Sequence, residues 1–571
     1  MNRRVILLVF IPLLVLSCCV AGVAVGVLAF SPLRERVMAL LGLRPQTFAA
    51  ELVPADAIFY ISLSYNLQAQ PGYETIRRAY LENPAVKRAL EDAKNNLKQE
   101  GKIDWDTEVA PWLGTEAGIF LLPVSSEELE RGEVPLVLLV ASRDLRASER
   151  FLQRLRELAA EQGPSFEERT YRGTRYWFRP AQQKNEPPIV MATVRDFVVF
   201  ATREQALQAV VDRAGGQGEA LARSERFRRV LQELPGQAVV LGYVDYPAFL
   251  KVAQEALLRQ PGVPSLQELV GTGPSAELVR ATEAFGFSGE LLPEGMRMQV
   301  VMLIRREGLS PEARALLDVP PITEGMFTWI PEDALVLFQS PQIGKQLQRS
   351  LDAIRAMPDA ARQLEDMEKA LGIDIERDLL SWMTGDLAII VQPVLATTVP
   401  GMPVGVSALI GTDRPDDARV SLERLESVLR MGGVLVEAGE LQGRPMRMVI
   451  DPNGMRVAAY AVGPEVVGIG VPPEALVKSH PERGPERTIR DNPRFQEVLR
   501  RLPERRNTLL FIDAQGIWNL VEGQLPPDER ETFRRNARPF LDPVRGIGIA
   551  SEALPGPAVQ RGVVFLQITP P

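Results

Sequence analysis

Two clusters of alternating acidic residues have a spacing that could bind a hard cation. In each cluster, three carboxylates separated by single residues lie between an isoleucine and a tryptophan, and the second cluster repeats the first with Asp374 in the place of Asp104. Carboxylate oxygens are ligands that Ca²⁺ prefers. Both clusters lack the central glycine and the distal glutamate of an EF-hand loop. The candidate metal ligands are Asp104, Asp106, Glu108, Asp374, Glu376 and Asp378.

A helix-capping role explains the same residues without a metal. Asp104 and Asp374 each precede a short helical segment, where a carboxylate accepts hydrogen bonds from the first backbone amides. The later acidic residues favour the positive end of the helix dipole, while Trp112 and Trp382 pack inward. We therefore expect capping rather than metal binding, and no cofactor.

The other residue types leave little for catalysis. The one histidine, His480, lies beside a proline in a polar loop and is expected to be exposed to solvent. Both cysteines, Cys18 and Cys19, lie in an apolar N-terminal run. Any Ser–His–acid triad would have to use His480, and a His-x-x-x-His zinc site is impossible. We predict no catalytic residues, and keep a carboxylate-dependent hydrolase as an alternative because acidic residues are plentiful.

Composition and charge narrow the classes of protein. The 571 residues are 46% hydrophobic and 24% charged, as in folded globular proteins. A chain of this length is too long for one hydrophobic core and predicts two or three domains. The net charge of −8 argues against a nucleic-acid partner.

The N-terminal segment is predicted to cross a membrane. Val5–Phe30 contains no charged residue, and as a helix it would extend about 39 Å, longer than a hydrocarbon core of about 30 Å. This length favours an uncleaved signal anchor over a cleaved signal peptide. Residues 1–4 are then a cytoplasmic tail, residues 31–50 a tether, and the body lies outside the cytoplasmic membrane.

Two motifs in this segment predict further interactions of the anchor. Gly22 and Gly26 form a small-xxx-small pair, which lets two helices approach closely and favours a homodimer. Val15–Cys18 loosely fits a lipoprotein signal, so Cys18 is a candidate for lipidation. The chain stays apolar after Cys18, and this favours the signal anchor.

An internal repeat predicts the architecture of the body. The stretch Ser224–Asp245 returns as Asn492–Asp513, and within it Phe227 is matched by Phe495 without any shift in spacing. The register holds across a helix, a proline turn and a strand, as expected for a duplicated fold. The sequence thus predicts two related lobes, at 51–304 and 330–571, joined by a connector at 305–329.

The periodicity of the first lobe predicts a mixture of strands and helices. Phe59, Ile61 and Leu63 alternate with polar residues, as in a half-buried strand. Arg195-Asp196 is typical of a hairpin turn. We expect an α+β fold with a largely antiparallel sheet in each lobe and helices on one face. The expected strands are 57–64, 117–124, 135–141, 175–179, 189–194, 197–201, 238–245 and 296–304, and the expected helices are 73–99, 146–160, 204–213, 224–233, 247–259 and another that ends near Ala284.

Two sequence runs carry a resemblance to a known family. Leu52–Ala57 stands before an alternating strand, and Gly372–Trp382 contains the second acidic cluster. Together with aspartate-ended strands that lead into helices, these runs resemble the bacterial envelope family called domain of unknown function 3352. The resemblance implies an N-terminal membrane segment and a large exported body. It implies no catalytic residues.

These observations favour a non-catalytic protein. We expect a membrane-anchored, extracytoplasmic binding or interaction protein of the bacterial envelope, with an unidentified protein or lipid partner. A carrier of lipids or other hydrophobic ligands is the first alternative, and the hydrolase is the second. The carrier would need an apolar pocket that runs deep into one lobe.

Overall fold

The computed structural model describes residues 48–570, except for 65, 126, 129–130, 132, 163–164, 182–186, 237, 258–272, 356–357, 395–402 and 553–558. The predicted anchor at 5–30, with Cys18, Gly22 and Gly26, therefore lies outside the described residues, as does the predicted tether up to residue 47. Within the described part of the chain, no helix has the length and apolar character needed to span a membrane.

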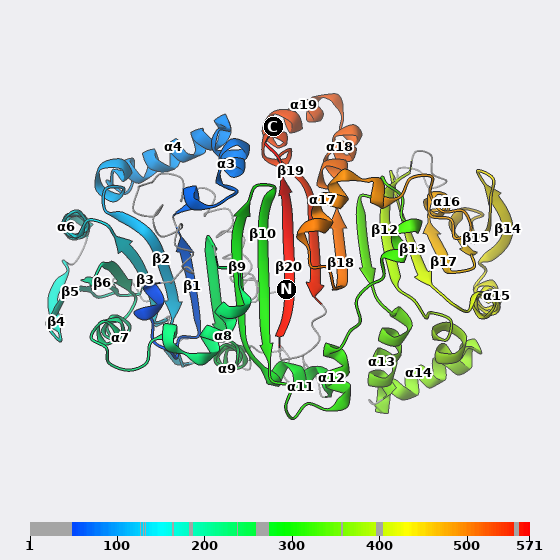
Figure 1. The fold of residues 1–571 in the computed structure, drawn as a ribbon, viewed down its shortest axis with the longest axis horizontal. Helices are drawn as coiled ribbons and strands as arrows, with labels where there is room; N and C mark the ends of the chain where they lie inside the picture. Colours follow the sequence, from blue (N-terminus) through cyan, green and yellow to red (C-terminus); the bar gives the residue numbers. More distant parts are fainter. Residues whose placement is uncertain are drawn as a thin grey trace. The chain divides into compact units, whose positions relative to one another are not determined.

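The chain divides into two compact units. The first extends to Ala313, and the second comprises Arg314–Gly556 and Gln560–Thr569. The described helices (Figure 1) are α3 (Tyr73–Ile76), α4 (Pro84–Gln99), α6 (Leu145–Gln162), α7 (Glu204–Ala214), α8 (Glu225–Glu233), α9 (Tyr246–Leu257), α11 (Pro274–Ala281), α12 (Pro311–Leu317), α13 (Ile343–Arg355), α14 (Pro358–Leu371), α15 (Pro415–Met431), α16 (Ala475–Lys478), α17 (Pro493–Arg501), α18 (Ala514–Gln524), α19 (Pro527–Asn536) and α20 (Arg538–Leu541).

The first unit contains an antiparallel sheet. Its described strands are β1 (Phe59–Ser64), β2 (Leu113–Leu121), β3 (Leu136–Ser142), β4 (Glu167–Tyr171), β5 (Thr174–Arg179), β6 (Ile189–Val194), β7 (Phe197–Ala201), β8 (Val240–Asp245), β9 (Thr282–Leu292) and β10 (Gly295–Ile304). They pair in the order β10-β9-β8-β1-β2-β3-β7-β6-β5-β4.

The second unit repeats this strand order. Its described strands are β11 (Val336–Ser340), β12 (Leu387–Pro393), β13 (Val404–Gly411), β14 (Leu435–Leu441), β15 (Arg444–Ile450), β16 (Arg456–Val462), β17 (Val466–Val471), β18 (Arg506–Ile512), β19 (Val544–Glu552) and β20 (Val559–Ile568). They pair in the order β20-β19-β18-β11-β12-β13-β17-β16-β15-β14, again antiparallel throughout. The α+β class and the large antiparallel sheet are therefore confirmed.

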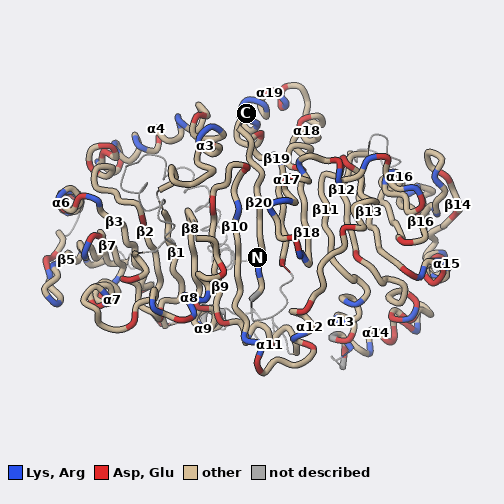
Figure 2. Tube along the Cα trace, viewed as in Figure 1, with Lys and Arg blue, Asp and Glu red and all other residues tan. Residues whose placement is uncertain are grey.

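The sheets are built from strands with few charged residues. Figure 2 shows that lysine, arginine, aspartate and glutamate gather on the helices and connections, while the strands are largely uncharged. Runs such as Ile189–Val194 and Phe197–Ala201 are almost entirely apolar, and most of their residues are buried. Such runs are typical of strands that are covered on both faces.

Helices lie on both faces of the first sheet, so the prediction of helices on one face is wrong. Neighbouring strand residues point to opposite faces. Leu139 belongs to a core that includes Leu207 of α7. The next residue, Val140, belongs to a separate core with Leu152 of α6. The sequence pattern could not assign these helices to faces, because the apolar runs in the strands have no polar side.

The second sheet has the same two-sided arrangement. Ala459 of β16 packs in a core with Leu476 of α16. Its neighbour Tyr460 packs against a different core that contains Leu422 of α15. In the described part of each unit, helices therefore pack on both faces of the sheet, and the two faces contribute to separate hydrophobic cores.

Two element predictions for the first lobe are also wrong. The predicted helix 73–99 is interrupted, and α4 begins at Pro84 with Asn83 as its cap. Proline favours the first turn of a helix and disfavours its interior. The sequence indicates a strand start at Gly286, but it did not predict the extent of β9 (Thr282–Leu292), because the glycines and serine of this strand weaken the pattern. A Cβ atom at Gly286 would lie 2.0 Å from a Val230 methyl group of α8, so the close packing of this helix requires glycine there.

Candidate functional site

The first acidic cluster forms a helix cap. Asp104 Oδ1 accepts hydrogen bonds from the backbone amides of Asp106 (3.1 Å) and Thr107 (3.2 Å). Glu108 Oε2 accepts one from the backbone amide of Asp104 (2.6 Å). This reciprocal pattern satisfies amides at the start of the helical turn Trp105–Val109.

Each carboxylate of this cluster also pairs with a different cation. The pairs are Asp104–Lys98 (2.7 Å), Asp106–Lys94 (3.0 Å) and Glu108–Arg154 (3.4 Å). The hydrogen bond from Lys98 lowers the pKa of Asp104 to about 2. The three side chains serve separate partners instead of converging on one point.

The second acidic cluster repeats the cap. Asp374 Oδ1 accepts from the backbone amide of Arg377 (2.9 Å), and Asp378 Oδ2 accepts from that of Asp374 (2.9 Å). Asp378 is buried and is also bound by Arg377 and Arg424, and the hydrogen bond from Arg377 is the main reason why its pKa falls to about 2. Glu376 pairs with Arg355 (2.8 Å). The described residues contain no group of three acidic, histidine or cysteine side chains arranged to hold a metal ion.

His480 is buried, so the prediction that it is exposed to solvent is wrong. Its exposed fraction is 0%. Nε2 lies 2.8 Å from the carbonyl oxygen of Pro445, and Nδ1 accepts a hydrogen bond from the backbone amide of Glu482 (3.3 Å). This pattern fits the tautomer with the proton on Nε2. Both ring nitrogens serve the fold of the loop.

A buried carboxyl group that the sequence did not reveal lies on β2. Glu116 accepts hydrogen bonds from Ser62 Oγ (3.0 Å), the backbone amide of Ala49 (3.3 Å) and, more weakly, Tyr60 OH (3.5 Å). Its burial raises its pKa from 4.5 to about 7, although these hydrogen bonds partly oppose the rise. Glu116 thus titrates near neutral pH in the interior of the first unit.

The second unit has a buried carboxyl group, Asp386, at the corresponding position of the repeat. Asp386 accepts hydrogen bonds from the backbone amide of Thr323 (2.6 Å), Thr323 Oγ1 (2.9 Å) and Gln339 Nε2 (3.0 Å). Like Glu116, it therefore ties the segment before the first strand of its unit to the sheet.

The feature best suited to bind a ligand is a cavity of about 660 Å³ in the first unit. This volume lies within the usual range for small-molecule sites, roughly 300–1,000 Å³. Its walls come from the turn between β6 and β7, the end of α7, the short helices Phe48–Glu51 and Leu221–Arg223, helix α8 and strand β8. The lining residues are Glu51, Arg195, Arg213, Gly216, Gly218, Ala220, Ala222, Arg223, Phe227, Arg228, Leu231, Gln232, Leu234, Pro235, Gly236 and Leu241.

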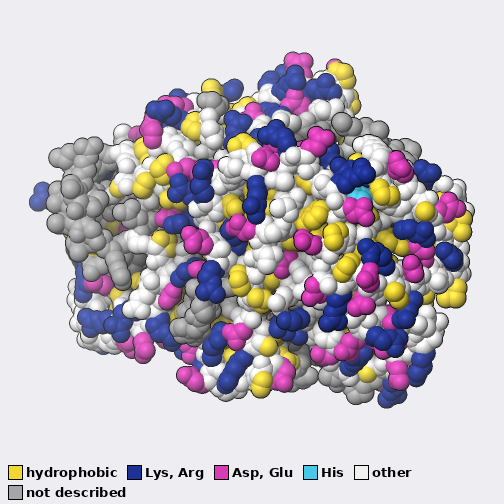
Figure 3. All heavy atoms as spheres, turned by 45° about the vertical axis from the view of Figure 1, so that its right-hand side comes forward, with side chains coloured by type: hydrophobic (Ala, Val, Ile, Leu, Met, Phe, Trp, Pro, Cys, Tyr) yellow, Lys and Arg dark blue, Asp and Glu magenta, His cyan; other side chains and the backbone are white. Residues whose placement is uncertain are grey.

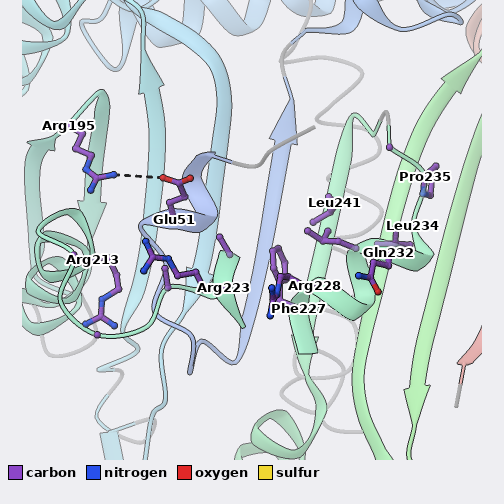
Figure 4. A pocket seen from close by; sticks show the side chains of 16 residues that line it. Glu51, Arg195, Arg213, Arg223, Phe227, Arg228, Gln232, Leu234, Pro235 and Leu241 are labelled. Carbon is purple, nitrogen blue, oxygen red and sulfur yellow. Dashed lines mark ion pairs between the residues drawn. The ribbon is translucent and has the colours of Figure 1, made fainter. Parts of the chain in front are cut away.

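The cavity combines a charged end with an apolar end. Figure 4 shows Arg195, Arg213 and Arg223 near Glu51 on one side, and Leu234 and Leu241 on the other. Four arginines and one glutamate line it, so the wall carries three positive charges in a chain whose net charge is −8. On the face shown in Figure 3, by contrast, side chains of both signs are interspersed.

Two of the cavity arginines have no partner among the described residues. Arg195 pairs with Glu51 (3.9 Å), and Arg213 donates to the carbonyl oxygen of Glu219 (3.0 Å). Arg223 and Arg228 are exposed, and neither makes an ion pair or a side-chain hydrogen bond within the described part of the chain. Their guanidinium groups are available to a ligand.

The cavity was not predicted, because its residues come from six separate elements and form no local motif. One signal was present in the repeat. In the register that matches Phe227 with Phe495, Arg223 and Arg228 correspond to Asp491 and Gln496. The charge thus changes at positions where the surrounding fold repeats.

Comparisons with known proteins give a family and distant structural similarity. No curated protein sequence matches the chain. Two solved structures of TP0453, crystal forms III and I, are each 10% identical to this chain, with a TM-score of 0.25. The match to form III covers 48% of this chain and 89% of the TP0453 chain, and the match to form I covers 50% and 90%. The chain matches the family described as protein of unknown function (DUF3352) over residues 14–568. It therefore belongs to the DUF3352 family.

Proposed function

We propose that this chain is a non-catalytic binding protein of the bacterial envelope and that its ligand occupies the cavity of the first unit. The observation that carries the proposal is the cavity itself, with its unpartnered Arg223 and Arg228 beside an apolar wall in the described part of the chain. The acidic clusters, which were the other candidate sites, have their carboxylates engaged in caps and ion pairs.

The proposed architecture is two related lobes behind one N-terminal anchor. The sequence repeat that matches Phe227 with Phe495 and the equal strand order of the two units support descent from a duplicated lobe. An isolated antiparallel β-bridge in each unit supports it further. Pro54 pairs with Ala220 in the first unit, and Pro331 pairs with Thr488 in the second. The apolar run at 5–30 supports the anchor, with the body outside the cytoplasmic membrane and a dimer through its two glycines.

The binding proposal can be tested by native mass spectrometry of the full chain released from a non-ionic detergent. We expect an additional mass that leaves on activation. Leu231→Trp should reduce its occupancy because the larger ring fills the cavity. The matched control is Leu499→Trp, which makes the same change at the repeat position and should keep the ligand. A wild-type chain without any bound mass, or equal occupancy in both variants, would contradict the proposal.

A carrier of hydrophobic ligands is the second candidate. The apolar end of the cavity, with Phe227, Leu234 and Leu241 almost fully buried, favours it. Extraction of the additional mass as a lipid would support this form of the function.

A further inference from the structure

We propose that the cavity of the first unit binds an anionic amphiphile, whose phosphate or carboxylate group pairs with Arg223 at the charged end, with Arg228 of α8 adding a second unpartnered positive charge, while its apolar part lies against α8 and β8. This inference rests on the proposed function and names the class of ligand.

The charges of the cavity select an anion. The guanidinium groups of Arg223 and Arg228 have no acidic partner among the described residues. Arg213 adds a third cation, and its Nε is buried without a hydrogen-bond partner in the described structure. A guanidinium presents parallel N–H donors that match the oxygens of a carboxylate or a phosphate. Only Glu51 among the lining residues opposes an anion, and it already pairs with Arg195.

The rest of the wall selects an apolar group. Beyond the arginines and Glu51, the side chains that line the cavity are mainly alanine, leucine, phenylalanine and proline. Among the described lining residues, Gln232 is the one neutral polar side chain. A sugar or a nucleobase would therefore find few hydrogen-bond partners, whereas an alkyl chain or ring would bury surface against Leu231 and Leu241.

The repeat shows that the fold does not need these arginines. In the second unit, Asp491 takes the place of Arg223 and forms a capping box with Thr488. Its carboxylate accepts a hydrogen bond from the backbone amide of Thr488 (2.8 Å). Gln496 takes the place of Arg228 on α17. The same short helix and longer helix form with either set of residues, so a role in folding does not account for the charges of the first unit.

The repeat also supplies the test variants. Arg223→Asp and Arg228→Gln install the residues of the second unit, and should therefore keep the melting temperature. The full chain in a non-ionic detergent is titrated by calorimetry with octyl phosphate, octanoate, octanol and inorganic phosphate. We expect octyl phosphate or octanoate to bind at least about tenfold more tightly than octanol, and each variant to weaken that binding about tenfold or more. Arg175→Asp, a charge change at an exposed position of β5 that does not line the cavity, is the control and should bind as the wild type does.

Each other result has a defined meaning. The proposal of an anionic headgroup would be wrong if octanol and the anionic probes bound equally, or if the folded Arg223→Asp and Arg228→Gln variants bound as the wild type does. Either result would leave the proposed function intact. Inorganic phosphate that binds as tightly as octyl phosphate would overturn the apolar subsite. A chain that binds no probe and carries no additional mass would overturn the proposed function itself. Between the two anions, the tighter one identifies the headgroup as phosphate or carboxylate.

Discussion

Glu116 should make the stability of the first unit depend on pH near neutrality. Burial raises its pKa from 4.5 to about 7, so the folded chain binds more protons than the unfolded chain between these values. Glu116 therefore makes its full contribution to the free energy of unfolding below about pH 4.5. As the pH rises through 7, this contribution falls by up to roughly 3 kcal/mol. Glu116→Gln mimics the protonated acid and should remove this loss. Thermal unfolding from pH 5 to 8 should show a flatter profile for the variant.

The matched control is Asp386→Asn, at the corresponding position of the second unit. Asp386 accepts several hydrogen bonds, including the short one from the Thr323 amide. The backbone amide and hydroxyl of Thr323 and the side chain of Gln339 reach the same oxygen, Oδ2, while the backbone amide of Gln342 donates weakly to Oδ1 (3.4 Å). The NH2 group of an asparagine would therefore have to face one of these two sets of donors. This variant should lower the melting temperature across the whole pH range. Parallel profiles for the wild type and Glu116→Gln would show that Glu116 does not titrate in this range.

At the level of elements, one helix–strand contact is made in both units by different chemistry. In the first unit, Arg156 of α6 lies 3.9 Å above the ring of Trp177 on β5. At the corresponding positions of the second unit, buried Glu426 of α15 forms a two-point ion pair with Arg447 of β15, at 2.7 Å for each contact. The first contact is a cation–π interaction, and the second is an ion pair in which the carboxylate is buried and the arginine is partly exposed.

This difference predicts the effect of exchanging the pair. Arg447→Trp should destabilise the second unit by about 3 kcal/mol, because it removes the main cation beside the buried Glu426 carboxylate. The double variant Glu426→Arg, Arg447→Trp recreates the contact of the first unit and should recover most of that loss. Denaturant unfolding of both variants measures the coupling between the two positions. A double variant no more stable than the single one would show that the two contacts are not interchangeable.

The same elements show what a sequence can predict. The hairpin of β6 and β7 and the helices α7 and α8 follow from periodicity, because each is determined by residues close in the chain. The strand β9 needs a glycine at position 286, because a side chain there would clash with a Val230 methyl group on helix α8. His480 looks polar in its own loop and is buried by contact with Pro445, which lies far from it in the sequence. The cavity was missed for the same reason, because long-range packing creates it.

At the scale of the whole molecule, the net charge and the cavity act on an anion in opposite directions. The chain carries −8 overall, which repels an anion at long range, while the cavity wall carries three positive charges in contact with it. The Debye length is about 8 Å at 0.15 M salt, so charges spread over the surface are already screened there. The arginine contacts in the cavity are shorter than this length and remain sensitive to added salt.

The affinity for octyl phosphate should therefore fall several-fold between about 0.15 and 0.5 M NaCl, where the Debye length shortens further. Octanol, which has no charge, should bind slightly more tightly over the same range because salt strengthens apolar burial. Arg228→Gln should reduce the salt dependence for octyl phosphate, since one cation fewer faces the anion. Calorimetric titrations at three salt concentrations measure these slopes. An affinity for octyl phosphate that rises with salt would mean that apolar contact, rather than the arginines, dominates recognition in the cavity.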